Sequence, residues 1–253
     1  MNVLTDRVTI VTGAGSGIGR ATARRFADEG ARVVCSGRTA ANIEETAKMI
    51  REAGGEAAAI RADVTEKREI EAMVDETLDR FGRLDFAFNN AGSTGDVAPT
   101  PEQTEADWDR VMDINLKGVW LCMKYEIPAM LETDGGCIVA TTSGSSLPDN
   151  GYRNLSPYVA SKKGVHGLTQ SAALEYAEYD LRVNAVAPGW IDDTKQTRDP
   201  DHEIREKAVA EIPRGQPGLP KDIAGTVVWL CSDDADHVTG HIVPIDGGKA
   251  ARY

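Results

Sequence analysis

The sequence predicts an α/β fold with a single doubly wound parallel sheet and helices on both faces. Short runs rich in β-branched residues alternate with longer amphipathic segments along the chain. The runs are apolar throughout rather than alternating, which is typical of strands that are covered on both faces. Neither an internal repeat nor an interdomain linker interrupts the pattern, so we expect the 253 residues to form one domain.

The individual elements follow from this alternation. Strands are expected at residues 8–11, 32–35, 57–61, 84–88, 137–141, 182–186 and 241–245. Helices are expected at residues 21–29, 40–53, 66–81, 108–131 and 157–176. Glycines at 54 and 55 end the second of these helices, and in the third the apolar residues recur on one side.

One segment, at about residues 192–220, does not fit the alternation. It is polar, charged and rich in proline and glycine, and only a short helix at 204–211 is expected within it. Long connections inside a compact domain are usually binding loops or lids. We therefore expect this segment to cover a substrate.

The charge and composition of the chain exclude several classes of binding partner and site. The net charge of -12 disfavours nucleic acid and anionic membranes. No apolar segment approaches the ~18 residues of a membrane span, and residues 1–6 do not resemble the start of a signal peptide. The four cysteines lack CxxC spacing, which predicts core thiols in a reducing compartment, and we expect a cytoplasmic protein. The four histidines lack ligand spacing, so no metal site is expected.

A glycine-rich stretch, TGAGSGIG at residues 12–19, connects the first expected strand to the first expected helix. Glycines let the backbone approach a pyrophosphate, and a helix N-terminus offers free N–H groups and a favourable dipole. This is the context of a Rossmann-type dinucleotide site. Cofactor contacts are expected from the loop residues Gly13, Ser16, Gly17, Ile18 and Gly19.

The end of the second expected strand bears on the choice of cofactor. An acidic residue that would hold a ribose 2′-hydroxyl is replaced by Gly37, and Arg38 follows. Because Arg38 can pair with a 2′-phosphate, we favour NADP(H) over NAD(H). NAD(H) stays open, since Ser16 leaves the glycine loop without a second basic residue. After the third strand, Asp63, beside Val64, can accept a hydrogen bond from the adenine, cap the next helix, or do both.

A tyrosine and a lysine form the candidate acid/base unit. Ser156-Pro157 indicates an N-cap and a first helical position, which places Tyr158 and Lys162 four residues apart on one helix face. At ~4 Å and an effective dielectric of ~20, an ammonium attracts a phenolate by about 4 kcal/mol, at most about 3 pKa units. We therefore expect Lys162 to bring the Tyr158 phenol toward a working pKa, with an oxidised nicotinamide adding to the effect.

These motifs, taken in order, resemble those of the short-chain dehydrogenase/reductase family, in its shorter branch of about 250 residues. The resemblance runs along nearly the whole chain. The matching motifs are Thr12-Gly13-x-x-x-Gly17-x-Gly19, Asn89-Asn90-Ala91-Gly92, Asn115, Ser143, Tyr158-x-x-x-Lys162 and Pro188-Gly189.

The resemblance implies reversible hydride transfer between a nicotinamide and a small-molecule alcohol or ketone. It implies that Ser143 polarises the substrate oxygen, that Tyr158 moves the proton, and that Lys162 also holds the nicotinamide ribose. Asn115, by its side chain or by a local kink, supports a water that connects Lys162 to solvent. Ser145 remains an alternative to Ser143, because it has the family's commonest spacing to the tyrosine, whereas Ser143 stands at the expected strand end.

Further cofactor contacts are implied by position. They are expected from Asn90, Ala91, Gly92, Pro188, Gly189, Ile191 and Thr194. The family usually has a threonine where this chain has Asp193, so either the loop shifts by one residue or Asp193 changes how the cofactor is held. Trp190 and Tyr152 are either pocket walls or packing residues.

The resemblance also implies a homotetramer or homodimer. The alternative function is a non-catalytic dinucleotide-binding sensor or scaffold, which would predict a broken catalytic set beside an intact glycine loop.

Overall fold

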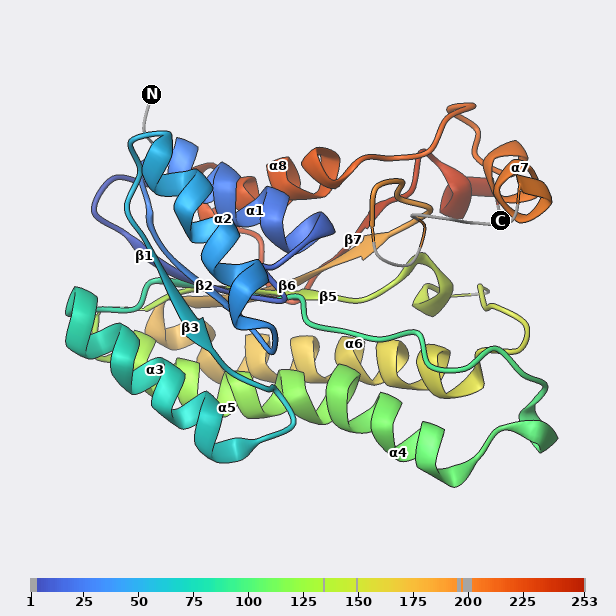
Figure 1. Ribbon diagram of the computed structural model, residues 1–253, viewed down its shortest axis with the longest axis horizontal. Helices are drawn as coiled ribbons and strands as arrows, with labels where there is room; N and C mark the ends of the chain where they lie inside the picture. The colour runs from blue at the N-terminus through green and yellow to red at the C-terminus, as the bar shows by residue number, and fades with distance from the viewer. Residues whose placement is uncertain (1–3, 134, 149, 195–196, 198–201, 253) are drawn as a thin grey trace.

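Seven parallel strands form one sheet in the order β3-β2-β1-β4-β5-β6-β7. The computed structural model describes residues 4–133, 135–148, 150–194, 197 and 202–252. Helices α1, α2 and α8 cover one face of the sheet, and α3, α5 and α6 cover the other (Figure 1). The predicted doubly wound α/β fold is confirmed.

The element bounds are as follows. The strands are β1 Val8–Thr12, β2 Arg32–Gly37, β3 Ala57–Arg61, β4 Phe86–Asn89, β5 Gly136–Thr141, β6 Leu181–Pro188 and β7 Ile242–Ile245. The α-helices are α1 Gly17–Asp28, α2 Ala40–Glu52, α3 Lys67–Phe81, α4 Glu105–Met112, α5 Gly118–Leu131, α6 Ser156–Tyr176, α7 His202–Ala210 and α8 Pro220–Cys231.

The uniformly apolar strands are explained by two core layers. Successive side chains on a strand point to opposite faces, so Ile10 packs with one layer and its neighbour Val11 with the other. The same split separates Ile138 from Val139 on β5. All four cysteines are buried free thiols within these layers, as expected.

Two helices differ from their prediction. The segment 108–131 is not one helix, because the π-helical turn Asp113–Lys117 separates α4 from α5. Helix α4 also begins earlier than expected, at Glu105, because the Thr104 hydroxyl accepts a hydrogen bond from the Asp107 amide. Helix α8 was not predicted, although Pro220 in its first turn and the buried spacing of Ile223 and Val227 are helix signals.

The carboxyl ends of the strands define where a ligand can bind. Parallel strands present these ends at one edge, and a doubly wound sheet binds ligands where its strand order reverses. Here the reversal lies between β1 and β4, so Thr12 and Asn89 flank it. In the described part of the chain, no helix is long and apolar enough to cross a bilayer.

Candidate active site

The glycine loop is packed so closely that side chains would not fit. Gly13 has a φ of +68°, and a Cβ there would lie 2.9 Å from Asn90 Nδ2. A Cβ on Gly19 would lie 2.2 Å from the carbonyl oxygen of Gly13. Ser16 precedes α1 in an extended conformation, its side chain makes no cap bond, and Ile18 packs partly buried against the core. The loop therefore offers a backbone cradle at the start of α1.

Hydrogen bonds join this loop to the end of β4. The Thr12 hydroxyl accepts from the amides of Asn90 (2.9 Å) and Ala91 (3.1 Å). In return, Asn90 Nδ2 donates to the Thr12 carbonyl at 3.1 Å. A Cβ on Gly92 would lie 3.3 Å from Asn115 Oδ1 and 3.5 Å from Lys162 Nζ. The segment that follows β4 thus connects the glycine loop to the candidate catalytic residues.

At the other end of the loop, Arg38 lies beside Asp63. Arg38 is exposed, and its Nε stands 4.0 Å from Asp63 Oδ2. The other Asp63 oxygen accepts from the amide (3.0 Å) and hydroxyl (2.9 Å) of Thr65. Helix α3 begins only at Lys67, so the alternative in which Asp63 caps it is wrong, because Asp63 closes the preceding turn. Val64 is buried against the position of Gly118.

Tyr158 is buried in the first turn of α6, beside Ser143. Its burial raises the pKa of the phenol, and a hydrogen bond with the Ser143 side chain acts in the opposite direction. The expectation that Ser156 caps α6 is wrong, because Leu155 occupies the cap position and Ser156 is already helical. The Ser156 hydroxyl donates instead to Gln103 Oε1 at 2.6 Å.

The two candidate serines have different surroundings. Ser143 follows β5, and its Oγ accepts hydrogen bonds from the amide (3.2 Å) and the hydroxyl (3.0 Å) of Ser145. Both serines are buried. Ser143 is the serine whose side chain bonds with the Tyr158 phenol, so Ser145 lies one step further from it.

Lys162 is buried and oriented toward the end of β5. Its Nζ donates to the Thr141 carbonyl at 2.7 Å, and burial lowers its pKa from 10.5 to about 8. The expected net lowering of the Tyr158 pKa is therefore wrong for the protein alone. Burial of the phenol outweighs its favourable contacts, and the same burial weakens the positive charge of Lys162.

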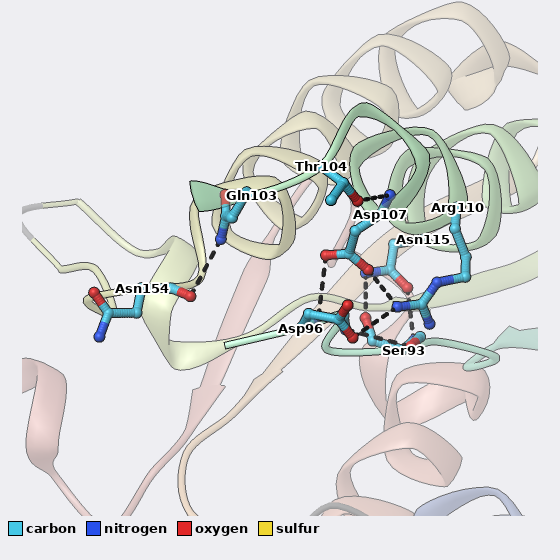
Figure 2. A network of polar contacts seen from close by, with 9 residues as sticks. Ser93, Asp96, Gln103, Thr104, Asp107, Arg110, Asn115 and Asn154 are labelled. Carbon is cyan, nitrogen blue, oxygen red and sulfur yellow. Dashed lines mark hydrogen bonds and ion pairs between the residues drawn. The ribbon is translucent and has the colours of Figure 1, made fainter. Parts of the chain in front are cut away.

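Asn115 lies in the π-helical turn between α4 and α5. Figure 2 shows it facing Ser93, whose amide donates to Asn115 Oδ1 at 2.8 Å and whose carbonyl accepts from Nδ2 at 2.8 Å. Nδ2 also donates to Ser161 Oγ at 3.1 Å. The expected kink is present as this π-helical turn. The Asn115 side chain forms its hydrogen bonds with the loop after β4 and with α6.

The loop after β6 brings Thr194, rather than Asp193, against the glycine loop. Asp193 has a φ of +59°, and the following Thr194 lies against the glycine loop, 3.4 Å from a Cβ placed on Gly17. The Thr194 hydroxyl donates to the Ile191 carbonyl at 3.4 Å. Ile191 is itself buried, and it pairs with Gly218 in a short β-bridge.

Pro188 and Gly189 form the end of β6 and the residue after it. Gly189 donates its amide to the Ile245 carbonyl at 3.0 Å, and a Cβ there would lie 2.8 Å from Asp246. The close approach of β6 and β7 thus requires glycine at this position.

Part of the expected lid is described. Trp190 Nε1 donates to Asp192 at 2.9 Å, and Arg205 of α7 donates to the same carboxylate at 2.5 Å, which holds the pKa of Asp192 below its usual range. Helix α7 is close to the expected helix 204–211. Residues 195–196 and 198–201 of this segment lie outside the described residues.

Tyr152 connects three segments around the phenol. It is close enough to Tyr158 to raise the pKa of that residue. Lys249 Nζ lies 5.7 Å from the centre of the Tyr152 ring and 2.6 Å from Glu211 Oε2, so the end of the chain and the segment after α7 meet the loop before α6. The sequence did not indicate Lys249 or Glu211, because they are distant in the chain.

His166 is another residue that was not predicted here. Its Nε2 lies 2.9 Å from Ser146 Oγ, and Ser146 bonds in turn to the Ser143 carbonyl at 2.6 Å. Burial and the nearby Lys163 lower the pKa of His166. Its spacing of four residues after Lys162 was the available signal.

Together these contacts place a phenol, an amine and two hydroxyls at the carboxyl edge of the sheet, beside a backbone cradle. Among the residues that the structure describes, no three His, Cys, Asp or Glu side chains gather as metal ligands do.

The comparisons with known proteins agree with this arrangement. Residues 13–250 match the family model described as enoyl-(acyl carrier protein) reductase. The chain is 40% identical to levodione reductase of Leifsonia aquatica over an alignment of 258 residues, gaps included, which covers 98% of this chain and 96% of the relative. A crystal structure of levodione reductase superposes with a TM-score of 0.91 at 40% identity, covering 99% of this chain and 100% of that chain.

Two further relatives have a similar sequence identity to this chain. Cyclohexanol dehydrogenase of an Acinetobacter species is 41% identical over an alignment of 255 residues, gaps included, which covers 99% of this chain and 98% of the relative. Cis-4-hydroxycyclohexanecarboxylate dehydrogenase of Sinomonas cyclohexanicum is 41% identical over 246 residues, 97% of each chain.

Proposed function

The chain belongs to the short-chain dehydrogenase/reductase family, and we propose that it interconverts a secondary alcohol and a ketone with NADP(H), using Tyr158 as acid/base. The observation that supports this most is the contact between the buried Tyr158 and Ser143 at the carboxyl edge of the sheet. Lys162 Nζ and Asn115 Oδ1 both lie close to Gly92, in the segment that follows β4.

The residues present fit a nicotinamide dinucleotide. A Cβ would collide with neighbouring atoms at Gly13 and Gly19, and Gly17 has a φ of +50°, so these glycines leave the backbone free to approach a pyrophosphate at the start of α1. Thr194 and Ile191 would contact its nicotinamide end, and Asp63 and Val64 would contact its adenine end. When bound, the nicotinamide supplies or accepts the hydride.

The chain's own groups manage the proton and the substrate oxygen. Ser143 would donate a hydrogen bond to the substrate oxygen, and Tyr158 would donate its proton to that oxygen or accept one from it. Lys162 would hold the nicotinamide ribose and, while protonated, stabilise the phenolate. Asn115 positions the loop after β4 through Ser93, so that Gly92 stays against Lys162.

Arg38 is the basis for preferring NADP(H). Its exposed guanidinium lies at the end of β2, where Gly37 contributes no carboxylate to hold a ribose 2′-hydroxyl or repel a phosphate. The nearby Asp63 carboxylate would orient the guanidinium without replacing it as the phosphate partner.

The relatives favour a ring-shaped substrate. Two of them are named for alcohols on a cyclohexane ring. Tyr152 and Trp190 would provide flat walls for such a ring, and the segment 192–220 would cover it. We therefore expect cyclohexanol- or cyclohexanone-type compounds to be turned over before linear ones.

The assembly and the location are parts of the same proposal. Trp108, Trp120 and Leu174 are exposed on the helical layer formed by α4, α5 and α6 (Figure 1). A second copy of the chain would cover these side chains in a homodimer or homotetramer. The four free buried thiols suit the reducing cytoplasm.

The test is a screen of cyclic and linear alcohols and ketones with both cofactors, followed by nicotinamide absorbance, with Tyr158→Phe as the blank. We expect turnover by the wild-type protein and a loss of at least about a hundredfold in the variant. Near-normal turnover by Tyr158→Phe would disprove the mechanism. Bound cofactor without turnover of any compound would favour a dinucleotide sensor.

A further inference from the structure

A side-chain clamp connects the turn before α4 with the first turn of α6. Gln103 uses both ends of its amide: its Oε1 accepts from Ser156 Oγ at 2.6 Å, and its Nε2 donates to the Asn154 carbonyl at 3.2 Å. Figure 2 shows Gln103 reaching across to Asn154. Two further bonds join the same segments, from the Ala98 amide to the Asn154 carbonyl (3.0 Å) and from Thr100 Oγ1 to Ser156 Oγ (3.2 Å).

The start of α6 has Pro157 in its first turn but no side-chain cap of its own. Leu155 at the cap position makes no side-chain cap bond, so the first turn lacks the usual local restraint. Asn154 has a φ of +64°, a conformation that costs free energy in residues other than glycine. A segment held in this way needs restraint from elsewhere in the fold.

The other side of the clamp is firmly held. Thr104, next to Gln103, caps α4 by accepting from the Asp107 amide at 3.1 Å. The buried Asp107 carboxylate accepts from the Asp96 amide at 3.0 Å and pairs with Arg110 (Figure 2). Gln103 therefore extends from a well-anchored turn to a poorly anchored one.

Tyr158 stands two residues after Ser156, within the turn that the clamp restrains. Its hydroxyl must meet Ser143, and a shift of the first turn would move the phenol along with the backbone. Catalysis is sensitive to displacements of this kind, because reacting groups work only within a narrow range of geometry.

We propose that Gln103 is a positioning residue that fixes the first turn of α6, and with it the Tyr158 hydroxyl, against Ser143. The proposal rests on the proposed function of Tyr158 as acid/base. Gln103 itself need not touch substrate or cofactor.

Gln103→Met keeps the length of the side chain and removes both of its hydrogen bonds. We expect kcat to fall about tenfold, as for the loss of two ordinary hydrogen bonds, with the NADPH dissociation constant unchanged. Ser156→Ala should have a smaller effect in the same direction. The double variant should be slower than Gln103→Met by less than Ser156→Ala alone is slower than the wild type, because the two changes share the Gln103–Ser156 bond and Ser156→Ala removes only the bond from Thr100 in addition. Gln103→Glu, which retains the acceptor for Ser156, should recover part of kcat.

The matched control is Glu102→Met, on the exposed neighbouring residue, which should leave kcat unchanged. The inference is wrong if Gln103→Met retains full kcat, if its effect adds to that of Ser156→Ala, or if NADPH binding weakens in proportion. Should Gln103→Met not fold, Ser156→Ala alone must lower kcat for the inference to stand.

A readout without substrate separates this inference from the proposed function. In protein labelled with carbon-13 at the tyrosine Cζ, the Tyr158 signal is identified by its loss in Tyr158→Phe. The clamp predicts that Gln103→Met, but not Glu102→Met, changes the chemical shift and the titration of that signal. If the signal changes while the wild-type protein turns over no substrate, only the proposed function fails. If turnover is normal and neither kcat nor the signal responds, only the positioning role fails.

Discussion

Ser145 donates its hydroxyl to the Ser143 oxygen across 3.0 Å, so the two serines that compete for one catalytic role are hydrogen-bonded partners. Ser143 is the one bonded to Tyr158. We expect Ser143→Ala to lower kcat by about a hundredfold or more, because the donor that polarises the substrate oxygen is lost. Steady-state kinetics with NADPH and a cyclic ketone would measure this.

Ser145→Ala is the matched control for that prediction. It removes a contact that orients Ser143 but leaves the Ser143 hydroxyl in place, so kcat should fall by less than about tenfold. The opposite order of effects would transfer the role to Ser145.

Arg38→Asp should reverse the cofactor preference. The variant loses a charge-assisted contact to a 2′-phosphate and adds a repelling carboxylate beside Asp63. We expect kcat/KM for NADPH to fall about tenfold to a hundredfold, and that for NADH to rise. Arg24→Asp, an exposed arginine on α1, makes the same change of charge away from the site. Unchanged NADPH kinetics in Arg38→Asp would show that NADP(H) preference does not depend on this residue.

Local patterns predicted the parts of the site that lie within one element. The glycine loop follows β1 directly, and Tyr158 and Lys162 share a helix face, so periodicity alone placed them correctly. The choice between Ser143 and Ser145 depends on where the phenol points, and spacing does not encode that. Likewise, Thr194 reaches the glycine loop directly after Asp193, a left-handed residue that nothing in the chain required.

Contacts between segments that are distant in the chain could not be predicted from sequence patterns. The π-helical turn at Asn115 matches a side chain that reaches back to Ser93, 22 residues earlier. The Ser156 hydroxyl looked like a helix cap, yet it bonds to Gln103, 53 residues away. Amphipathic spacing predicted most of the helices, but it indicated neither of these tertiary partners nor the burial of Lys162.

That buried charge gives a stability prediction. Lys162 binds its proton less tightly in the folded protein, where its pKa is about 8, than in the unfolded chain, where its pKa is the ordinary 10.5. Between these pH values the unfolded chain holds the extra proton, so the free energy of unfolding increases as the pH rises through this window. Without cofactor, this contribution of Lys162 should amount to about 3 kcal/mol, and it is isolated as the difference between the pH dependences of wild-type protein and Lys162→Met.

Denaturant unfolding across that window measures the difference, and Lys163→Met is the matched control because Lys163 is exposed. Equal pH slopes for wild-type protein and Lys162→Met would mean that Lys162 stays charged in the folded state.

Glu126 on α5 should show the opposite pH dependence. It is fully buried, Asn89 Nδ2 donates to its Oε2 at 2.7 Å, and burial raises its pKa to about 7. Among the residues that the structure describes, Glu126 Oε1 and Asn89 Oδ1 have no hydrogen-bond partner. A protonated Glu126 suits this environment better than a carboxylate does.

Because the folded carboxyl keeps its proton from pH 4.5 to about 7 while the unfolded one loses it, stability falls as the pH rises through that window. Glu126→Gln removes the charge, and its amide can donate to Asn89 Oδ1. We expect the free energy of unfolding of the variant, relative to that of the wild-type protein, to increase by about 3 kcal/mol from the lower to the higher of these pH values. Denaturant unfolding measures this difference. Glu132→Gln, at an exposed position, should show no such gain. A gain that does not grow with pH would mean that Glu126 is ionised throughout, and that the bond from Asn89 is enough to hold a buried carboxylate.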